Sequence, residues 1–186
     1  MICGPNGAGK STLLSAVSQE LPYTGLVTLD GTDLRRMKPR PLARRMAMLR
    51  QLSDLAYAYT VEEVVAMGRY AHRGLLQADN GGAEAVECAL QAVQLQDKRR
   101  QNILTLSGGE LQRTFLAQVF AQNPQILILD EPANHLDLIY QKHIFSLIET
   151  WLRQPGRAVV SVVHDLSLAR KYGTHAVLMH LSLIHI

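Results

Sequence analysis

Short apolar runs and stretches with helical periodicity alternate along this chain. Residues 126–129 and 158–163 are largely Ile, Leu and Val, a pattern typical of strands buried on both faces of a parallel sheet. Shorter strands are predicted at residues 24–29, 46–49 and 176–179, and helices at residues 10–19, 42–45, 60–67, 83–95, 110–122 and 138–152. The alternation predicts an α/β fold with a mostly parallel sheet and flanking helices.

Length and composition are consistent with one domain. The chain has 186 residues, of which 47% are hydrophobic, and a net charge of +3, so it can bury a sizeable core. Its apolar runs fall short of the roughly 20 residues that span a bilayer. Cys3 and Cys88 have no metal-ligand spacing, and we expect both to be buried.

The segment GPNGAGKST fits the phosphate-loop pattern at every fixed position. Glycines allow backbone N–H groups to close on phosphates, Lys10 neutralises their charge, and the Ser11 hydroxyl can reach Mg²⁺. The helix that follows points its N-terminus at the anion. The sequence therefore predicts a nucleotide site made by Gly4, Pro5, Asn6, Gly7, Ala8, Gly9, Lys10, Ser11 and Thr12.

Two adjacent acids, Asp130 and Glu131, follow the strand at residues 126–129. In doubly wound sheets ligands bind at the carboxyl ends of strands, where two carboxylates can hold a metal and position a water. The alternative is a simple helix cap after a core strand. The phosphate loop in the same chain favours the functional interpretation.

The segment LSGGELQR at residues 106–113 resembles the signature of ABC-type ATPases. The motif order also matches that family: phosphate loop, Gln51, signature, the acid pair at residues 130–131, the Leu-Asp pair at residues 136–137, and His164. The resemblance covers residues 4–179. The segment TVEEVVAMGR at residues 60–69 is similar to the ATPases that drive uptake of iron-siderophore, haem or cobalamin.

The resemblance implies a P-loop NTPase of the RecA-like type with an inserted α-helical subdomain and an incomplete antiparallel β subdomain. The core would comprise residues 1–51 and 106–186, with an atypical tail at 181–186, and the helical subdomain residues 52–105. ATP and Mg²⁺ would be the cofactors, with the metal held by Ser11, Gln51 and Asp130. Glu131 would act as general base, and Gln51 and His164 would position the water and the γ-phosphate.

The resemblance also implies partners. Two copies would form a head-to-tail homodimer in which the nucleotide of one protomer contacts Ser107, Gly108, Gly109 and Asp137 of the other. The chain would lie peripherally on the cytoplasmic face of the membrane, dock on integral-membrane permease subunits, and act indirectly with a solute-binding protein. No nucleic acid is expected as a partner.

Two other interpretations stay open at this stage. A cluster of cations could place the chain near nucleic acid or anionic lipid, which would suit an ABC-type ATPase acting on nucleic acid or the ribosome. The chain could also be an inactive fragment, because the strands that the family places before the phosphate loop, together with the aromatic residue that stacks on adenine, have no counterpart here. We accordingly expect an N-terminal truncation. The cationic cluster comprises Arg35, Arg36, Lys38, Arg40, Arg44, Arg45 and Arg50.

Overall fold

The computed structural model describes residues 1–50, 57–73, 79–134 and 136–180, and the backbone of residues 183–185. Gln51 lies outside the described residues, so its expected role is not placed. Among the described residues, six strands form one sheet in the order β4-β5-β6-β1-β7-β8. The first five run parallel, and β8 pairs antiparallel with β7.

The strands of this sheet are β1 (Ile2–Cys3), β4 (Met46–Leu49), β5 (Ile126–Asp130), β6 (Ala158–Val162), β7 (Val177–His180) and β8 (Leu183–His185); β2 (Thr28–Leu29) and β3 (Thr32–Asp33) form a separate hairpin. The α-helices are α1 (Lys10–Val17), α2 (Pro39–Arg45), α3 (Val61–Met67), α4 (Gly82–Ala92), α5 (Gly108–Ala121), α6 (Leu138–Leu152) and α7 (Leu166–Tyr172). Short 3₁₀ helices occupy Leu34–Arg36, Gly68–His72, Gln96–Lys98 and Ile103–Thr105.

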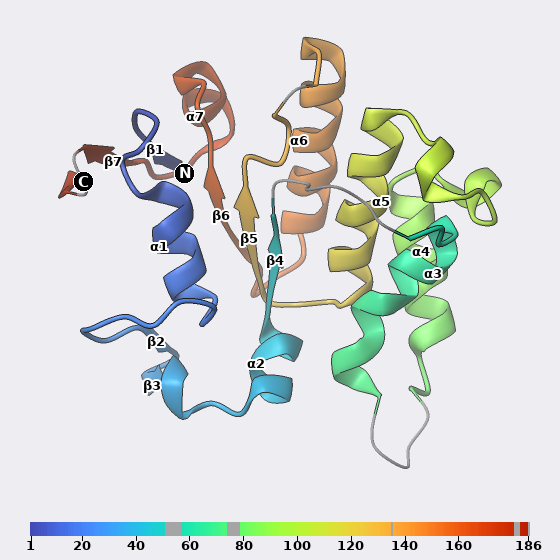
Figure 1. The fold of residues 1–186 in the computed structure, drawn as a ribbon, viewed down its shortest axis with the longest axis horizontal. Helices are drawn as coiled ribbons and strands as arrows, with labels where there is room; N and C mark the ends of the chain where they lie inside the picture. The colour runs from blue at the N-terminus through green and yellow to red at the C-terminus, as the bar shows by residue number, and fades with distance from the viewer. Residues whose placement is uncertain (51–56, 74–78, 135, 181–182, 186) are drawn as a thin grey trace.

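Helices cover both faces of the sheet, with α1 on one side and α5 and α6 on the other (Figure 1). The central strand β5 shows why. Leu127 and Leu129 point into the larger core beneath α5 and α6, whereas Ile128 packs with Leu14 of α1. Because successive side chains of a strand point to opposite faces, an unbroken apolar strand requires cover on both sides. The predicted α/β fold with its mostly parallel sheet is confirmed.

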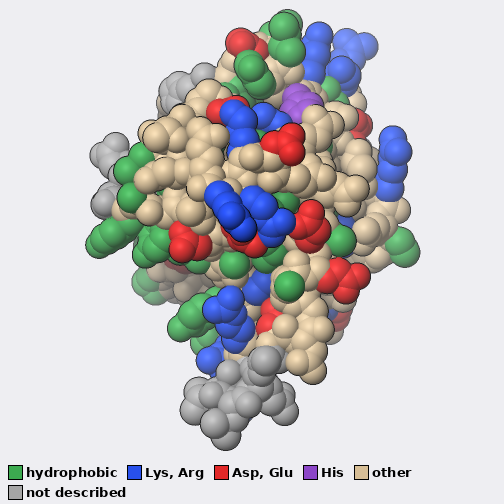
Figure 2. Space-filling view, turned by 90° about the vertical axis from the view of Figure 1, so that its right-hand side faces the viewer, with side chains coloured by type: hydrophobic (Ala, Val, Ile, Leu, Met, Phe, Trp, Pro, Cys, Tyr) green, Lys and Arg blue, Asp and Glu red, His purple; other side chains and the backbone are tan. Residues whose placement is uncertain are grey.

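In the described part of the segment between β4 and β5, the regular elements are α-helices and short 3₁₀ helices. Helices α3 and α4 pack on each other and on α5, on the far side of α5 from the sheet (Figure 1). Thr60 caps α3 in a reciprocal box with Glu63, as its sequence predicts. On the outer face of this segment, basic and acidic side chains intermix (Figure 2), and Arg99 pairs with both Glu62 and Glu87. None of the helices in the described residues has the length and apolar content needed to cross a bilayer.

Three expectations need correction. The strand predicted at residues 24–29 is confined to Thr28–Leu29. Strand β6, predicted to be buried, is not buried along its whole length, because Val160 is 37% exposed. Cys88 is exposed whereas Cys3 is buried, since residue 88 lies off the buried stripe of α4 formed by Val86, Ala89 and Leu90.

Candidate functional site

The phosphate loop leaves the carboxyl end of β1 and closes on the N-terminus of α1. Gly4 passes so close to β7 that a Cβ at this position would stand 2.1 Å from the carbonyl oxygen of Met179. Gly7 and Gly9 have φ angles of 79° and 89°, a left-handed conformation that glycine adopts without steric cost. These glycines therefore meet backbone requirements of the loop itself.

Lys10 is the buried cation of this loop. Its side chain belongs to a residue that is only 5% exposed, and Nζ donates to the carbonyl oxygens of Gly4 at 2.9 Å and Pro5 at 3.0 Å. Both acceptors are neutral, and a buried ammonium is stabilised far more by an anion. The position of Lys10 inside the loop thus fits a phosphate group.

Ser11 and Asp130 bring the loop and β5 together across 119 residues of sequence. The Ser11 hydroxyl donates to Oδ1 of Asp130 at 3.1 Å, and Asp130 is 8% exposed. A hydroxyl beside a single carboxylate suits Mg²⁺, which commonly binds one or two carboxylates together with substrate phosphates and water. Among the residues that the structure describes, no group of three or more His, Cys, Asp or Glu side chains could hold a metal alone. The Ser11 hydroxyl and the Asp130 carboxylate fit Mg²⁺ that is bound together with phosphate oxygens.

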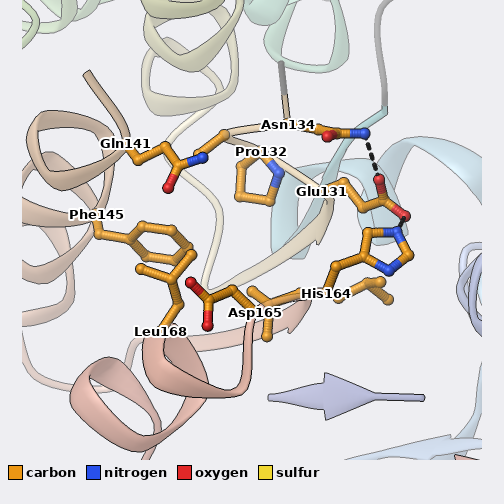
Figure 3. A pocket seen from close by; sticks show the side chains of 11 residues that line it. Glu131, Pro132, Asn134, Gln141, Phe145, His164, Asp165 and Leu168 are labelled. Atoms are coloured by element: carbon orange, nitrogen blue, oxygen red, sulfur yellow. Dashed lines mark hydrogen bonds and ion pairs between the residues drawn. The ribbon is translucent and has the colours of Figure 1, made fainter. Parts of the chain in front are cut away.

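Glu131 follows directly, in an unusual backbone conformation. Its φ angle is 51°, a left-handed geometry that costs of order 1 to 3 kcal/mol for such a residue. The side chain turns toward the end of β6, where Nε2 of His164 contacts Oε1 of Glu131. Asn134 donates from Nδ2 to the other oxygen, Oε2, at 2.7 Å (Figure 3).

The acid and the imidazole border a small cavity at the carboxyl edge of the sheet (Figure 3). Apolar and polar side chains share its wall, with Phe145 and Leu168 on one side and Asp165 capping α7 through the amide of Ser167 at 2.7 Å. The structure thus brings the predicted base and His164 into contact. Asn134 was not among the predicted residues; it has no motif of its own, and its only sequence signal is its spacing of three residues from Glu131.

The signature segment forms the N-terminus of α5. Ser107 caps this helix in a reciprocal box with Glu110, and Lys98 contacts the same carboxylate. The Lys98 ammonium and the backbone amide of Ser107 lower the pKa of Glu110 to about 2. A Cβ at Gly108 would enter open space. The N-terminus of α5 is therefore held by the contacts of Glu110 with Ser107 and Lys98, and the space beside Gly108 is open.

Asp137 caps α6, the helix whose Tyr140 lies beside the signature segment. Its Oδ1 accepts from the backbone amides of Ile139 at 3.1 Å and Tyr140 at 3.0 Å. The ring of Tyr140 lies 3.2 Å from where a Cβ on Gly109 would be. The predicted site residues therefore fall into two groups, one around Lys10, Asp130 and Glu131, and one at the start of α5 and α6. Both lie along the carboxyl edge of the sheet, at separate places (Figure 1).

The cationic cluster is partly neutralised. Arg35 pairs with Asp33 at 2.9 Å, Arg45 with Asp30, and Arg50 with Glu20. Arg44 donates to the carbonyl oxygen of Ala71 at 3.0 Å. These four arginines therefore make intramolecular contacts, which weakens the argument that the cluster is a surface for nucleic acid.

Comparison with known proteins agrees with this geometry. The chain is 48% identical over 174 residues to the uncharacterized ABC transporter ATP-binding protein YvrA of Bacillus subtilis, covering 92% of this chain and 39% of that protein. It is 42% identical to the hemin import ATP-binding protein HmuV of Pseudomonas entomophila, covering 96% and 71%. It is 39% identical to the ferric enterobactin transport ATP-binding protein FepC of Escherichia coli, covering 95% and 66%. The chain thus spans about two fifths to somewhat over two thirds of these relatives.

A solved structure shares the fold. The cbiO1 protein from Clostridium perfringens, part of the ABC transporter complex cbiONQ, superposes with a TM-score of 0.82 at 22% identity, covering all of this chain and 75% of that one. The family model described as ABC transporter matches residues 1–134. These matches, with the phosphate loop, the signature and the acid pair in the places just described, show that the chain belongs to the ATP-binding proteins of the ABC transporter family.

Proposed function

We propose that this chain binds ATP with Mg²⁺ and hydrolyses it to power an importer of an iron-siderophore or haem-type substrate through a separate permease. The names of the Pseudomonas and Escherichia relatives support these two substrate classes. The observation that carries the catalytic part is the junction of loop and sheet. Lys10 is buried in the phosphate loop, and the next residue, Ser11, contacts Asp130, which directly precedes Glu131 in the chain.

The chemistry follows from the charges that phosphoryl transfer develops. Lys10 and the amides of the loop stabilise the phosphate oxygens, and Ser11 and Asp130 would hold Mg²⁺, which would supply further positive charge beside the phosphates. Glu131 acts as the general base that accepts a proton from the attacking water. Its carboxylate lies at the carboxyl edge of the sheet, in contact with His164, which places it beside the proposed phosphate site. His164 also binds the γ-phosphate. We propose that Gln51 binds the metal and positions the attacking water, and this proposal rests only on its place in the order of the motifs.

A homodimer would complete the site. The amides at the start of α5 form an anion-binding terminus, and Gly108 leaves this terminus open. Because the signature group and the phosphate loop lie at separate places in one chain, we propose that Ser107, Gly108 and Gly109 contact the nucleotide of a second copy, with Asp137 aligning that copy. Leu138 and Ile139, beside Asp137, are 60% and 78% exposed, which suits a surface covered by a partner.

The division of labour within the chain is also a proposal. Residues 1–51 and 106–186 would form the ATPase core, and residues 52–105 a helical subdomain that docks on the permease and works with a solute-binding protein indirectly. The packing of α3 and α4 on α5 supports this, because a movement of the signature helix would be transmitted to that segment. The chain would then lie peripherally at the cytoplasmic face of the membrane.

The test is Mg²⁺-dependent ATP turnover by the purified chain beside Glu131→Gln. This variant should bind ATP as tightly as the wild type and turn it over about two orders of magnitude more slowly. Glu149→Gln is the matched control, because Glu149 is an exposed acid of α6 and should leave turnover unchanged. Undiminished turnover in Glu131→Gln would exclude Glu131 as the base. Turnover that is equal with and without Mg²⁺ would exclude the metal assignment.

A further inference from the structure

A tight turn connects Glu131 to Asn134 immediately after β5. The backbone amide of Asn134 donates to the carbonyl oxygen of Glu131 at 3.1 Å. The turn is also tied to α5, because Nε2 of the buried Gln112 donates to the carbonyl oxygen of Pro132 at 2.6 Å. The backbone between Glu131 and Asn134 is therefore held in place, and the short side chain of Asn134 starts from a fixed position relative to Glu131.

The carboxylate of Glu131 is held at both oxygens. Nδ2 of Asn134 donates to Oε2 at 2.7 Å, and Nε2 of His164 contacts Oε1. Figure 3 shows the two side chains approaching this carboxylate from different sides. A carboxylate oxygen accepts about two hydrogen bonds, so each oxygen retains a place for a water molecule after these contacts.

We propose that Asn134 is a positioning residue for Glu131, and that it fixes the plane of the carboxylate that receives the proton of the attacking water. This inference rests on the proposed role of Glu131 as general base. A glutamate has a broad terminal torsion, and a contact at one oxygen leaves the carboxylate free to rotate about it. The second contact, from Asn134, stops that rotation. A general base must lie within hydrogen-bond reach of the proton and in the correct orientation.

Kinetics of the full chain test this role with ATP and Mg²⁺. Asn134→Ala should lower kcat by roughly tenfold to a hundredfold, the range for losing one hydrogen bond to a charged group. The KM for ATP should stay within about twofold of the wild-type value, because Asn134 acts in the transition state and not in binding. Asn134→Asp, which has the same size but no donor and adds a like charge, should lower kcat at least as much. Gln154→Ala, which removes an exposed carboxamide beyond the end of α6, should change neither constant.

A double-mutant cycle separates positioning from a general loosening of the loop. If Asn134 acts through Glu131, then Asn134→Ala should have no further effect on the residual turnover of Glu131→Ala. An additive loss would overturn the proposal. A second measurement does not depend on turnover: the side-chain amide resonances of Asn134 should shift in Glu131→Ala. Resonances that stay in place would show that the contact is absent and would likewise overturn it.

The same set of variants distinguishes this inference from the proposed function. Wild-type turnover in Glu131→Ala would refute the role of Glu131, and the role of Asn134 would fall with it. A strong loss in Glu131→Ala together with wild-type kcat in Asn134→Ala would refute the role of Asn134 alone. A loss in both, without additivity and with KM unchanged, is the result that we expect.

Discussion

Removing the charge of Glu110 should destabilise the chain in a pH-dependent way. Glu110 is the third residue of α5, where its carboxylate accepts from the backbone amide of Ser107 at 2.9 Å and contacts Nζ of Lys98. Glutamine can replace glutamate in a capping box. The variant Glu110→Gln therefore keeps an acceptor for the Ser107 amide and loses chiefly the ion pair.

The size of the effect follows from the pKa. Lys98 and the Ser107 amide lower the pKa of Glu110 from 4.5 to about 2, which sets an upper bound of roughly 3 kcal/mol on the stabilisation. The Lys98 side chain is 40% exposed and that of Glu110 is 19% exposed, so water screens the pair, and we expect about 1 to 2 kcal/mol. Because the folded pKa is depressed, this contribution is fully present above about pH 4.5 and is lost as the pH falls toward 2.

Urea unfolding at several pH values measures this contribution. The difference in free energy of unfolding between wild type and Glu110→Gln should be constant from pH 7 to about pH 5 and should narrow below pH 4.5. Lys98→Met should by itself lower the free energy of unfolding at pH 7 by most of the amount that Glu110→Gln does. In the double variant the two losses should not add, because both substitutions remove the same ion pair. A difference that is the same at pH 7 and pH 3.5, or that widens on acidification, would refute the electrostatic reasoning.

Three further perturbations test packing. Arg69→Met should lower the free energy of unfolding by about 3 to 5 kcal/mol, because it leaves the carboxylate of Asp79 without its cation. The side chains of Arg69 and Asp79 are only 10% and 11% exposed. Arg45→Met is its matched control, because its pair is 29% and 75% exposed and should contribute at most about 1 kcal/mol. Gly68→Ala should cost about 1 to 3 kcal/mol by thermal unfolding, because its Cβ would lie 2.1 Å from a backbone oxygen of α5; an unchanged Tm would contradict that approach. Mass spectrometry after thiol alkylation of the native chain should find Cys88 modified well before Cys3, whose pKa is raised by burial.

Sequence patterns predicted most of the elements because burial is periodic. The run at residues 126–129 is apolar at each position, and the structure buries its side chains alternately on two faces. The capping box of Thr60 and Glu63 could be found by spacing alone, because a capping interaction is local. The strand predicted at residues 24–29 shrank to two residues, since a short apolar stretch at a sheet edge depends on the strand that it pairs with.

Side-chain contacts between distant segments were beyond sequence reasoning. Lys98 and Glu110 are twelve residues apart and belong to different elements, so no periodic pattern indicates that they meet. Asn134 is similar, because the contact with Glu131 depends on a left-handed backbone angle at a non-glycine residue. Side chains that bond to backbone or to charges at turns leave only a weak trace in composition. The motifs therefore indicated the proposed reacting groups, whereas the side chains that contact those groups could be identified only from the structure.

The order of the strands explains why separate motifs meet at one place. Strands β5, β6 and β1 are neighbours in the sheet, although they lie far apart in the sequence. Their carboxyl ends deliver the acid pair, His164 and the phosphate loop to one edge. The sequence could assign each motif to a strand end, and the neighbour relation alone makes Ser11 meet Asp130 and Glu131 meet His164. A change in strand order would leave each motif intact but would separate the proposed reacting groups, so the strand order is itself a requirement of the proposed chemistry.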